Sequence, residues 1–349
     1  MNSTCLGING FNKLGRAILT ASFLDPTITV TAINDPFFNI DFMCYLLRHE
    51  CPHIGNLTSE GGEYLVINDT HKILITNAHE CSSMSWGQQH VDVVVECSRV
   101  YTTRDRCWAH LAVGAPTVVI AAQSVDAALV HIMVNEDMLD KKLPVICGGD
   151  LIGAVMAPFV DILLRYAGID EIVYTAIHGS LPLDSGGGRS LAFSEWCQAR
   201  YTAFASDSIT SYRHEGAYTL NKLFPQLKGK ISGNAYQVST HQGCMVDIYA
   251  HSTKIPFLDK SELNEVLLKA IKQDKYKNFI DSSAPNEALL SADCVGHHEI
   301  IYEQESLSCM PTSSTYRMRL WMDLERCYAI DLIEMIKRIS EAKNINNIN

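Results

Sequence analysis

Hydrophobic residues in the first third of the chain form short, continuous, β-branched runs. These runs predict strands at residues 3–10, 28–35, 71–77, 91–98 and 116–122, with a helical segment after the first of them. Strands that are apolar on both faces are typical of a parallel sheet covered by helices, because an antiparallel sheet with one face in water would alternate with polar residues. We therefore expect a doubly wound α/β domain in this part of the chain.

The pattern changes after an apolar helical segment at residues 156–168. Longer runs between extended loops predict strands at residues 171–180, 230–240, 244–254, 297–304 and 316–323, and one clear helix at residues 261–273. This arrangement indicates an α+β domain built on a mostly antiparallel sheet.

A last amphipathic segment at residues 327–343 predicts a helix that returns to pack on the first domain. We therefore divide the chain into a first domain of residues 1–150, with the returning helix at 325–342, and a second domain at 151–324. The polar end of the chain, residues 343–349, is expected to fray.

Composition and charge narrow the class of protein. The chain has 349 residues, 47% of them hydrophobic and 19% charged, which fits a globular protein of two domains. A formal net charge of −11 argues against nucleic acid or an anionic membrane as a partner. The start lacks a signal-peptide pattern, and no apolar run reaches the roughly eighteen residues of a membrane span. We therefore expect a cytoplasmic protein whose scattered cysteines are mostly buried thiols.

The first predicted strand leads into GINGFNKLGR, residues 7–16, and the second ends at Asp35. In a Rossmann dinucleotide site, glycines let the backbone approach a pyrophosphate at a helix N-terminus, and an acidic residue about twenty positions later binds the ribose hydroxyls. Asn12 occupies the place of one expected glycine. The motif alone therefore leaves two interpretations open, a nucleotide site or a turn that only packs a helix on a strand.

Seven segments together resemble a known family. They are GINGFNKLGR, AINDPF, SWGQQHVDVVVECSRVY, GAPTVVIAA, YTAIHGS, LFPQLKGKISGNAYQVST and LWMDLERCY. Their order and separations resemble those of phosphorylating glyceraldehyde-3-phosphate dehydrogenase, with erythrose-4-phosphate dehydrogenase as a near relative, over residues 6–339. The resemblance implies a Rossmann domain that binds NAD, an α+β second domain, a C-terminal helix that returns to the first domain, and a homotetramer.

The reaction that the resemblance implies needs a cysteine thiolate to attack an aldehyde, a histidine to activate it, NAD to accept hydride and phosphate to cleave the thioester. The resemblance places the nucleophile before an Ala-Pro pair, at the position of Leu151, and places the histidine at His178. Cys147 would be a substitute thiol only if the register slipped. We therefore interpret Cys147 as a core cysteine and His178 as a retained residue without a partner thiol.

The positions that bind phosphate in the family have changed as well. Where the resemblance implies threonine, arginine, glycine or serine, this chain has Leu181, Leu183, Gln237, His214, Glu215 and Asp150. Two carboxylates facing a dianionic phosphate would repel it by roughly several kcal/mol at a low effective dielectric. The carboxylates and imidazoles of this set, with His178, would suit either a divalent metal or, as we expect, a solvated polar pocket without one.

The cofactor site is matched in part. The positions that agree with the adenosine and pyrophosphate half are Asn9, Gly10, Phe11, Gly15, Arg16, Asn34, Asp35 and Ser98. In contrast, Arg99 replaces a glycine, Ala121 replaces a serine, and Leu324 replaces the asparagine that holds the nicotinamide amide. We therefore expect NAD, where it binds, to be held by its adenosine half more than by its nicotinamide half.

Two functional hypotheses follow. The first is a pseudoenzyme, a homotetramer or a mixed oligomer with an active paralogue, that has lost aldehyde oxidation and serves as a nucleotide-binding, regulatory or scaffolding subunit. The second is an NAD-dependent dehydrogenase of glyceraldehyde 3-phosphate or another aldehyde or sugar phosphate, with Cys147 or bound water as nucleophile and His178 as base. The combined loss of the nucleophile, the arginine and most hydroxyl donors favours the first. Nucleic-acid binding through the dinucleotide groove finds no support in the acidic charge.

Overall fold

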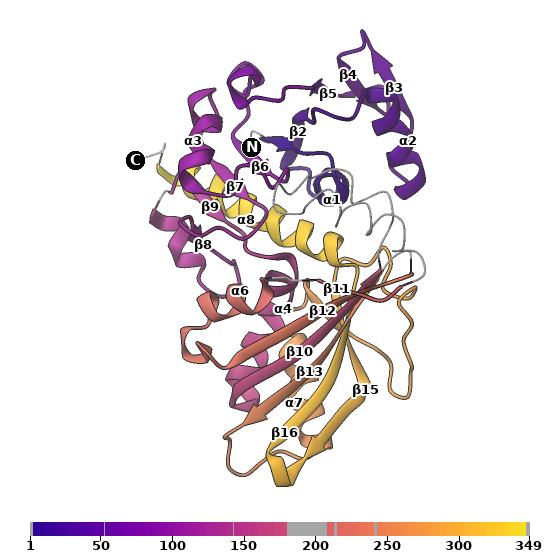
Figure 1. Ribbon diagram of the computed structural model, residues 1–349, viewed down its shortest axis with the longest axis vertical. Coiled ribbons are helices and arrows are strands. Elements are labelled where there is room, and N and C mark those ends of the chain that lie inside the picture. Colours follow the sequence, from indigo (N-terminus) through magenta and orange to yellow (C-terminus); the bar gives the residue numbers. More distant parts are fainter. Residues whose placement is uncertain are drawn as a thin grey trace.

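The chain forms two sheets that lie in opposite halves of the molecule, with helices packed against them (Figure 1). The computed structural model of the protein describes residues 3–51, 53–141, 143–179, 208–212, 215–240 and 243–346. Within these residues, the first domain contains a nine-stranded sheet and the second domain a seven-stranded sheet. The predicted fold class, a Rossmann α/β domain followed by an α+β domain, is confirmed.

The first sheet is built from strands that are buried on both faces. Val93, Val94 and Val95 are fully buried in its central strand β6, which has parallel neighbours on both sides. In spatial order the strands are β3 (Leu57–Glu60), β4 (Tyr64–Ile67), β5 (His71–Thr76), β2 (Ile28–Asn34), β1 (Thr4–Asn9), β6 (Val93–Glu96), β7 (Val118–Ile120), β9 (Val145–Cys147) and β8 (Ala128–Leu129). Only β3, β4 and β5 pair antiparallel, at one edge of this described sheet. The helices of this domain are α1 (Lys13–Ser22), α2 (Ile40–Glu50) and α3 (Arg104–Ala112).

Glycines bring α1 close to β1. Gly10 follows β1 with a φ of +102°, in the left-handed region that favours glycine. A Cβ on Gly15 would lie 2.1 Å from the carbonyl oxygen of Gly10, so only glycine allows this approach. Asn12 is the N-cap of α1: its side chain accepts a hydrogen bond from the N–H of Gly15 (3.1 Å) and donates one to the carbonyl of Cys97 (2.7 Å). The residue that replaces the expected glycine therefore closes the turn with its own side chain.

The second sheet has one face against helices. Ile172, Tyr174 and Ala176 of β10 are fully buried, whereas Val173 between them is 45% exposed. In spatial order the strands are β11 (Thr210–Tyr212), β12 (Ile231–Val238), β10 (Ile169–Gly179), β13 (Cys244–Ser252), β16 (Thr315–Met322), β15 (Ile300–Met310) and β14 (Ile280–Ser282). Among the described pairs only β10–β12 and β14–β15 are parallel, so the prediction of a mostly antiparallel sheet is confirmed. The helices are α4 (Leu151–Ile162), α6 (Gly216–Leu223) and α7 (Lys260–Ile271), and α4 continues as a π-helical turn at Leu163–Ala167.

The last helix, α8 (Leu324–Asn346), leaves the second sheet and runs along α1 and α4 (Figure 1). Leu332 and Ile336 of α8 are fully buried, and the Tyr328 hydroxyl donates a 2.8 Å hydrogen bond to the carbonyl of Gly149. The helix extends to Asn346, into the segment for which we expected fraying, because no glycine or proline interrupts it there. Residues 347–349 lie outside the described residues.

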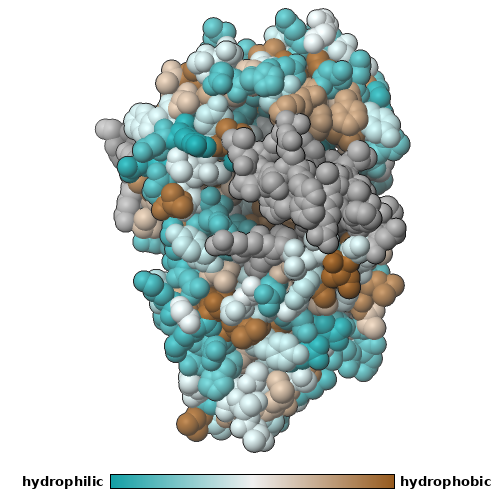
Figure 2. All heavy atoms as spheres, in the orientation of Figure 1, coloured by the Kyte–Doolittle hydropathy of each residue, from teal (hydrophilic) through white to brown (hydrophobic). Residues whose placement is uncertain are grey.

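Among the described residues on the face shown in Figure 2, exposed hydrophobic residues form small groups among hydrophilic ones and no broad apolar belt. None of the described helices is long and apolar enough to cross a membrane.

Replacing Gly15 by alanine should destabilise the fold, because the new Cβ would overlap the Gly10 carbonyl and push α1 away from β1. We expect Gly15→Ala to lower the free energy of unfolding by about 1–3 kcal/mol, measured by urea unfolding followed by circular dichroism. Gly87→Ala is the control, because a Cβ there meets its nearest heavy atom at 3.4 Å, an ordinary contact. Equal stability of the two variants would contradict this packing argument.

Candidate functional site

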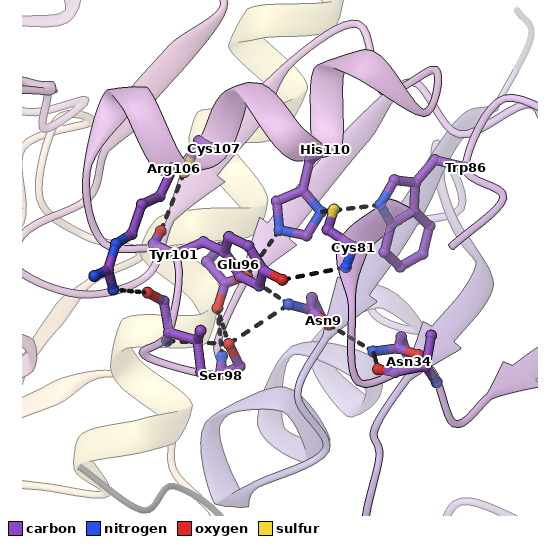
Figure 3. A network of polar contacts seen from close by, with 12 residues as sticks. Asn9, Asn34, Cys81, Trp86, Glu96, Ser98, Tyr101, Arg106, Cys107 and His110 are labelled. Atoms are coloured by element: carbon purple, nitrogen blue, oxygen red, sulfur yellow. Dashed lines mark hydrogen bonds and ion pairs between the residues drawn. The ribbon is translucent and has the colours of Figure 1, made fainter. Parts of the chain in front are cut away.

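The carboxyl ends of β1, β2 and β6 meet at the centre of the first sheet, where Asn9, Asn34 and Glu96 form a chain of polar contacts (Figure 3). Asn9 Nδ2 donates to Glu96 Oε2 at 2.6 Å, and Asn34 Nδ2 donates to Asn9 Oδ1 at 2.9 Å. All three residues are at least 98% buried. In a Rossmann sheet the ligand binds outside these strand ends, at the point where the strand order reverses. This chain of side chains therefore forms the floor of the candidate dinucleotide site.

Glu96 is the centre of this network. Its Oε1 accepts hydrogen bonds from the backbone N–H of Ser98 (2.7 Å) and from the Ser98 hydroxyl, and its Oε2 accepts from Asn9 and lies 3.0 Å from His110 Nε2. Four groups thus surround a carboxyl group that is fully buried, and this set suits the ionised, acceptor-only form. A buried carboxylate is tolerated when it is bonded in this way.

Trp86 fixes the tautomer of His110. The indole N–H only donates, and it lies 3.0 Å from His110 Nδ1, so Nδ1 accepts and the proton sits on Nε2, facing Glu96.

Cys81 Sγ lies 3.1 Å from the same Nδ1, which gives Cys81, His110 and Glu96 the order of a Cys-His-carboxylate triad. However, burial raises the pKa of Cys81 to about 12, with Glu96 and Glu80 adding to the effect. A thiol with a raised pKa lacks the thiolate character of a nucleophilic cysteine.

Asp35 occupies the place that the motif gives to the ribose-binding acid. Its Oδ2 accepts a hydrogen bond from the N–H of Phe11 (2.8 Å), and its Oδ1 accepts from Phe37 (2.9 Å) and Phe38 (3.3 Å). These backbone donors hold the carboxylate at the end of β2 beside the glycine turn, with 2% of the residue exposed. A ribose hydroxyl at this position would share the carboxylate with the backbone.

Two other residues of the predicted cofactor set have structural partners. Arg16 is 2% exposed and donates from Nε and Nη2 to the two carboxylate oxygens of Glu50 at 2.6 and 2.7 Å, and from Nη1 to the carbonyl of Phe11 at 2.9 Å. Ser98 is engaged with Glu96, as described above. In this structure both side chains support the turn and the floor of the crevice.

Arg99 stands where the resemblance implies glycine, and the backbone explains the family's preference. Its φ is +62°, in the left-handed region that non-glycine residues rarely adopt, and its side chain is exposed. Ala121 lies behind the floor, 1% exposed, with its N–H donating to the carbonyl of Glu96 at 3.0 Å. The turn after β6 therefore carries an exposed positive charge, whereas Ala121 behind it is packed.

Helix α4 begins at the position predicted for the missing nucleophile. Leu151 is the first residue of α4 and lies half-buried against the core. Asp150 is the N-cap, with its carboxylate accepting from the N–H groups of Ile152 (3.1 Å) and Gly153 (3.3 Å). A helix N-terminus of this kind stabilises a thiolate when a cysteine is present. Here it is capped by a carboxylate and carries a hydrocarbon side chain.

Cys147, the alternative thiol, lies in the core. It ends β9, is fully buried, and donates through Sγ to the carbonyl of Ala122 at 3.1 Å. Burial raises its pKa, and burial raises the pKa of all eleven cysteines among the described residues. Cys197 lies outside the described residues. No described thiol therefore has the lowered pKa of a catalytic cysteine.

His178 lies near the end of β10, between its register partners Gln237 of β12 and Cys244 of β13. Its Nδ1 is 3.0 Å from the carbonyl oxygen of Gly179. Gln237, which replaces the arginine that the resemblance implies, has a buried Oε1 with no hydrogen-bond partner in the described part of the chain. Cys244 is fully buried, and burial raises its pKa, so this neighbouring thiol is not poised for attack either.

A hollow of about 10 Å³ next to His178 is closed by residues from both ends of the chain. Its lining includes Leu324, which replaces the nicotinamide-binding asparagine, and the ion pair between Lys13 Nζ and Glu325 Oε2 at 3.0 Å. A space of this size holds about one water molecule. Among the described side chains, Lys13, Leu324 and Glu325 leave only this small space beside His178.

The remaining residues of the predicted phosphate site are Leu181, Leu183, His214 and Glu215. Leu181, Leu183 and His214 lie outside the described residues, and Glu215 is exposed before α6. Within the described ranges, no group of three or more histidine, cysteine, aspartate or glutamate side chains is placed to hold a metal.

Sequence reasoning missed the network around Glu96. The available signal was the run VVVEC at residues 93–97, where a glutamate directly follows three buried valines. A carboxylate at the end of a buried central strand needs several donors, and His110, held by the indole of Trp86, supplies one of them from another segment.

Comparisons with known proteins match segments in both domains of the chain. Residues 4–104 match the family described as "Glyceraldehyde 3-phosphate dehydrogenase, NAD binding domain", and residues 153–324 match its "C-terminal domain". The chain is similar to glyceraldehyde-3-phosphate dehydrogenase 4 of Caenorhabditis elegans (28% identity), glyceraldehyde-3-phosphate dehydrogenase 1 of Kluyveromyces lactis (26%) and the cytosolic enzyme of that name from Chondrus crispus (27%). The alignments cover 97%, 96% and 98% of this chain and 99%, 99% and 100% of the relatives.

Glu96→Gln should destabilise the first domain, because the amide offers one acceptor oxygen where the carboxylate offered two. At least one of the buried donors on Asn9, Ser98 and His110 then loses its acceptor, and we expect a loss of about 2–3 kcal/mol in the free energy of unfolding. Guanidinium unfolding followed by tryptophan fluorescence measures this loss. Glu60→Gln, which removes an exposed ion pair with Lys72, is the control and should change stability by less than about 1 kcal/mol. A Glu96→Gln effect as small as that of the control would contradict the role given to this carboxylate.

Proposed function

This chain belongs to the glyceraldehyde-3-phosphate dehydrogenase family, and we propose that it is a member that has lost phosphorylating aldehyde oxidation and acts as a nucleotide-binding, regulatory or scaffolding subunit. The observation that carries the proposal is Leu151 at the first position of α4, where the reaction needs a thiolate. A hydrocarbon side chain has no lone pair with which to form the thioester. Because burial raises the pKa of each described thiol, no alternative nucleophile is supported in the described residues.

The surroundings of the phosphate groups support the same proposal. Asp150 brings a carboxylate to the N-terminus of α4, and Gln237 is uncharged where the family's arginine would bridge the phosphates. The exposed Glu215 adds a second negative charge before α6. Each change makes the pocket less favourable for a dianionic substrate, so restoring the thiol alone would not restore the reaction.

We infer that the adenosine half of the cofactor site is retained and the nicotinamide half is not. Asp35 is held at the end of β2 next to the turn at Gly10, where it could bind ribose hydroxyls. At the other end, Leu324 and the ion pair between Lys13 and Glu325 fill the space beside His178. When bound, NAD supplies a hydride acceptor, but these residues give its nicotinamide ring no place beside the histidine.

We propose that the protein works in the cytoplasm as a homo-oligomer or as a mixed oligomer with an active paralogue. The Chondrus crispus relative is named as cytosolic. The second sheet supports self-association, because Val173 and Tyr249, register partners on β10 and β13, are 45% and 39% exposed on the face opposite the helices. Arg317 on β16 is the register partner of Tyr249. Its guanidinium forms an ion pair with Asp247, which lies on the same strand as Tyr249.

The proposal predicts that purified protein produces no NADH from glyceraldehyde 3-phosphate, NAD and inorganic phosphate above the background rate. Removal of an acyl-transfer nucleophile costs about six decades in kcat in a well-studied protease. Leu151→Cys should gain iodoacetate labelling at the new thiol, detected by mass spectrometry, and still show no turnover, because Asp150 and Gln237 remain. Prompt NADH formation by the wild-type protein, with labelling of Cys147, would overturn the proposal in favour of the dehydrogenase.

Calorimetry should show that ADP-ribose binds as tightly as NAD, within about threefold, and that nicotinamide mononucleotide does not bind. The reason is that the contacts to the adenosine half remain while Leu324, Lys13 and Glu325 close the other end. Leu324→Asn, which supplies an amide for the nicotinamide, should shift the ratio toward NAD by up to about fivefold. A wild-type preference for NAD over ADP-ribose of about tenfold or more would show that the nicotinamide half is also bound.

A further inference from the structure

A cavity of about 1010 Å³ lies where the two domains meet along α8, at the opposite end of α1 from the dinucleotide crevice. Its walls are the loop after α1, the segment at residues 132–137, the loop after α7 and one side of α8. None of the predicted catalytic or cofactor-binding residues lies on these segments. The cavity is large enough to take several side chains at once, because ordinary small-molecule pockets reach roughly 300–1,000 Å³.

The floor of this cavity is apolar. Ile132, Met133 and Ile333 contribute side chains that are at most 7% exposed, and half-buried Phe279 extends the floor toward the second domain. At the rim, Leu24 is 57% exposed. A surface leucine beside a concave apolar floor is an arrangement that a partner's apolar side chains would cover.

Some charged side chains around the floor form ion pairs, and others do not. The basic side chains of the wall are each paired with a carboxylate: Lys337 with Asp25 (3.2 Å), Lys275 with Asp161 (2.6 Å) and Arg338 with Glu334 (3.3 Å). Glu136 and Asp137, at the start of a 3₁₀ turn (Glu136–Lys141), are exposed, and neither forms an ion pair with a described residue. Among the described side chains, the rim therefore presents two carboxylates without an ion-pair partner next to an apolar floor.

We propose that this cavity, called the groove below, is a docking site for a basic amphipathic helix of a partner protein. The apolar face of such a helix would cover Leu24 and the floor, and its Lys or Arg residues would face Glu136 and Asp137. A second copy of this chain is a poor occupant, because the net charge of −11 on each copy opposes contact with an acidic rim. The site would serve a regulatory or scaffolding subunit, but it does not depend on the loss of aldehyde oxidation.

A synthetic Leu/Lys helix of about four turns, labelled with fluorescein, is the probe, and fluorescence anisotropy with the full-length protein measures its binding. We expect a Kd tighter than about 100 μM, weakening with added salt, and no binding of the same helix with Glu in place of Lys. Hydrogen exchange of the complex should show protection at residues 132–137 and 330–338. Glu136→Lys with Asp137→Lys should weaken binding by about tenfold or more, and Leu24→Ser should weaken it by several-fold.

Because an acidic protein attracts basic peptides in general, the control carries the same change of net charge elsewhere. Glu63→Lys with Glu265→Lys alters two exposed carboxylates, one in each domain, and should leave binding unchanged within about twofold. Equal loss in both double variants, no binding of the Leu/Lys helix, or protection outside the groove would overturn the proposal. Concentration-dependent protection of the groove without peptide would also overturn it, because a second copy would then be the occupant. All variants should keep the circular dichroism and melting temperature of the wild type.

Discussion

The carboxylate of Glu96 is the constraint on which the first domain depends. It is fully buried, yet no cation neutralises it within the described network; neutral donors from Asn9, Ser98 and His110 surround it instead. Each donor sits on a different segment, so satisfying one charge fixes the end of β1, the turn after β6 and α3 in one arrangement. Loss of any one donor would leave this buried carboxylate short of a hydrogen bond, which is more costly than the loss of an exposed ion pair. The position of the crevice follows from this network before any ligand is considered.

The N-termini of α1 and α4, where this kind of fold can bind anions, are both capped by side chains of the chain itself. Asn12 caps α1 where a glycine would open the turn to a pyrophosphate, and Asp150 caps α4 where a thiolate and a phosphate would be stabilised. The caps differ in effect. The Asn12 side-chain oxygen accepts from one backbone N–H of α1 and adds no charge to that N-terminus, whereas the Asp150 carboxylate adds a negative charge to the N-terminus of α4. A nucleotide at the first terminus is therefore easier to reconcile with the structure than a phosphorylated substrate at the second.

Local patterns predicted much of the fold, and contacts between distant residues account for what they missed. The buried runs gave β1, β2, β5, β6 and β7, and the helical pattern at residues 261–273 gave α7. The helices α2 and α3 were not predicted, and the mean hydropathy of α3 is low because arginines begin it. At the site, the motif identified Asp35 and the glycine turn, but it could not show that Arg16 is paired with Glu50, 34 residues away. Such pairing is decided by tertiary packing and leaves no local signal.

The start of α4 is held by packing that does not involve a reactive side chain. Gly149 has a φ of +94°, and a Cβ on Gly153 would lie 2.6 Å from the carbonyl oxygen of Gly216, so the turn and the helix are held by packing against α6. Leu151 contributes to that packing as a half-buried apolar residue. The backbone geometry of this turn is therefore maintained by glycines and by the Asp150 cap, which need no sulfur. Stability and catalysis are separable at this turn, because the residues that set its backbone are not the residue that would react.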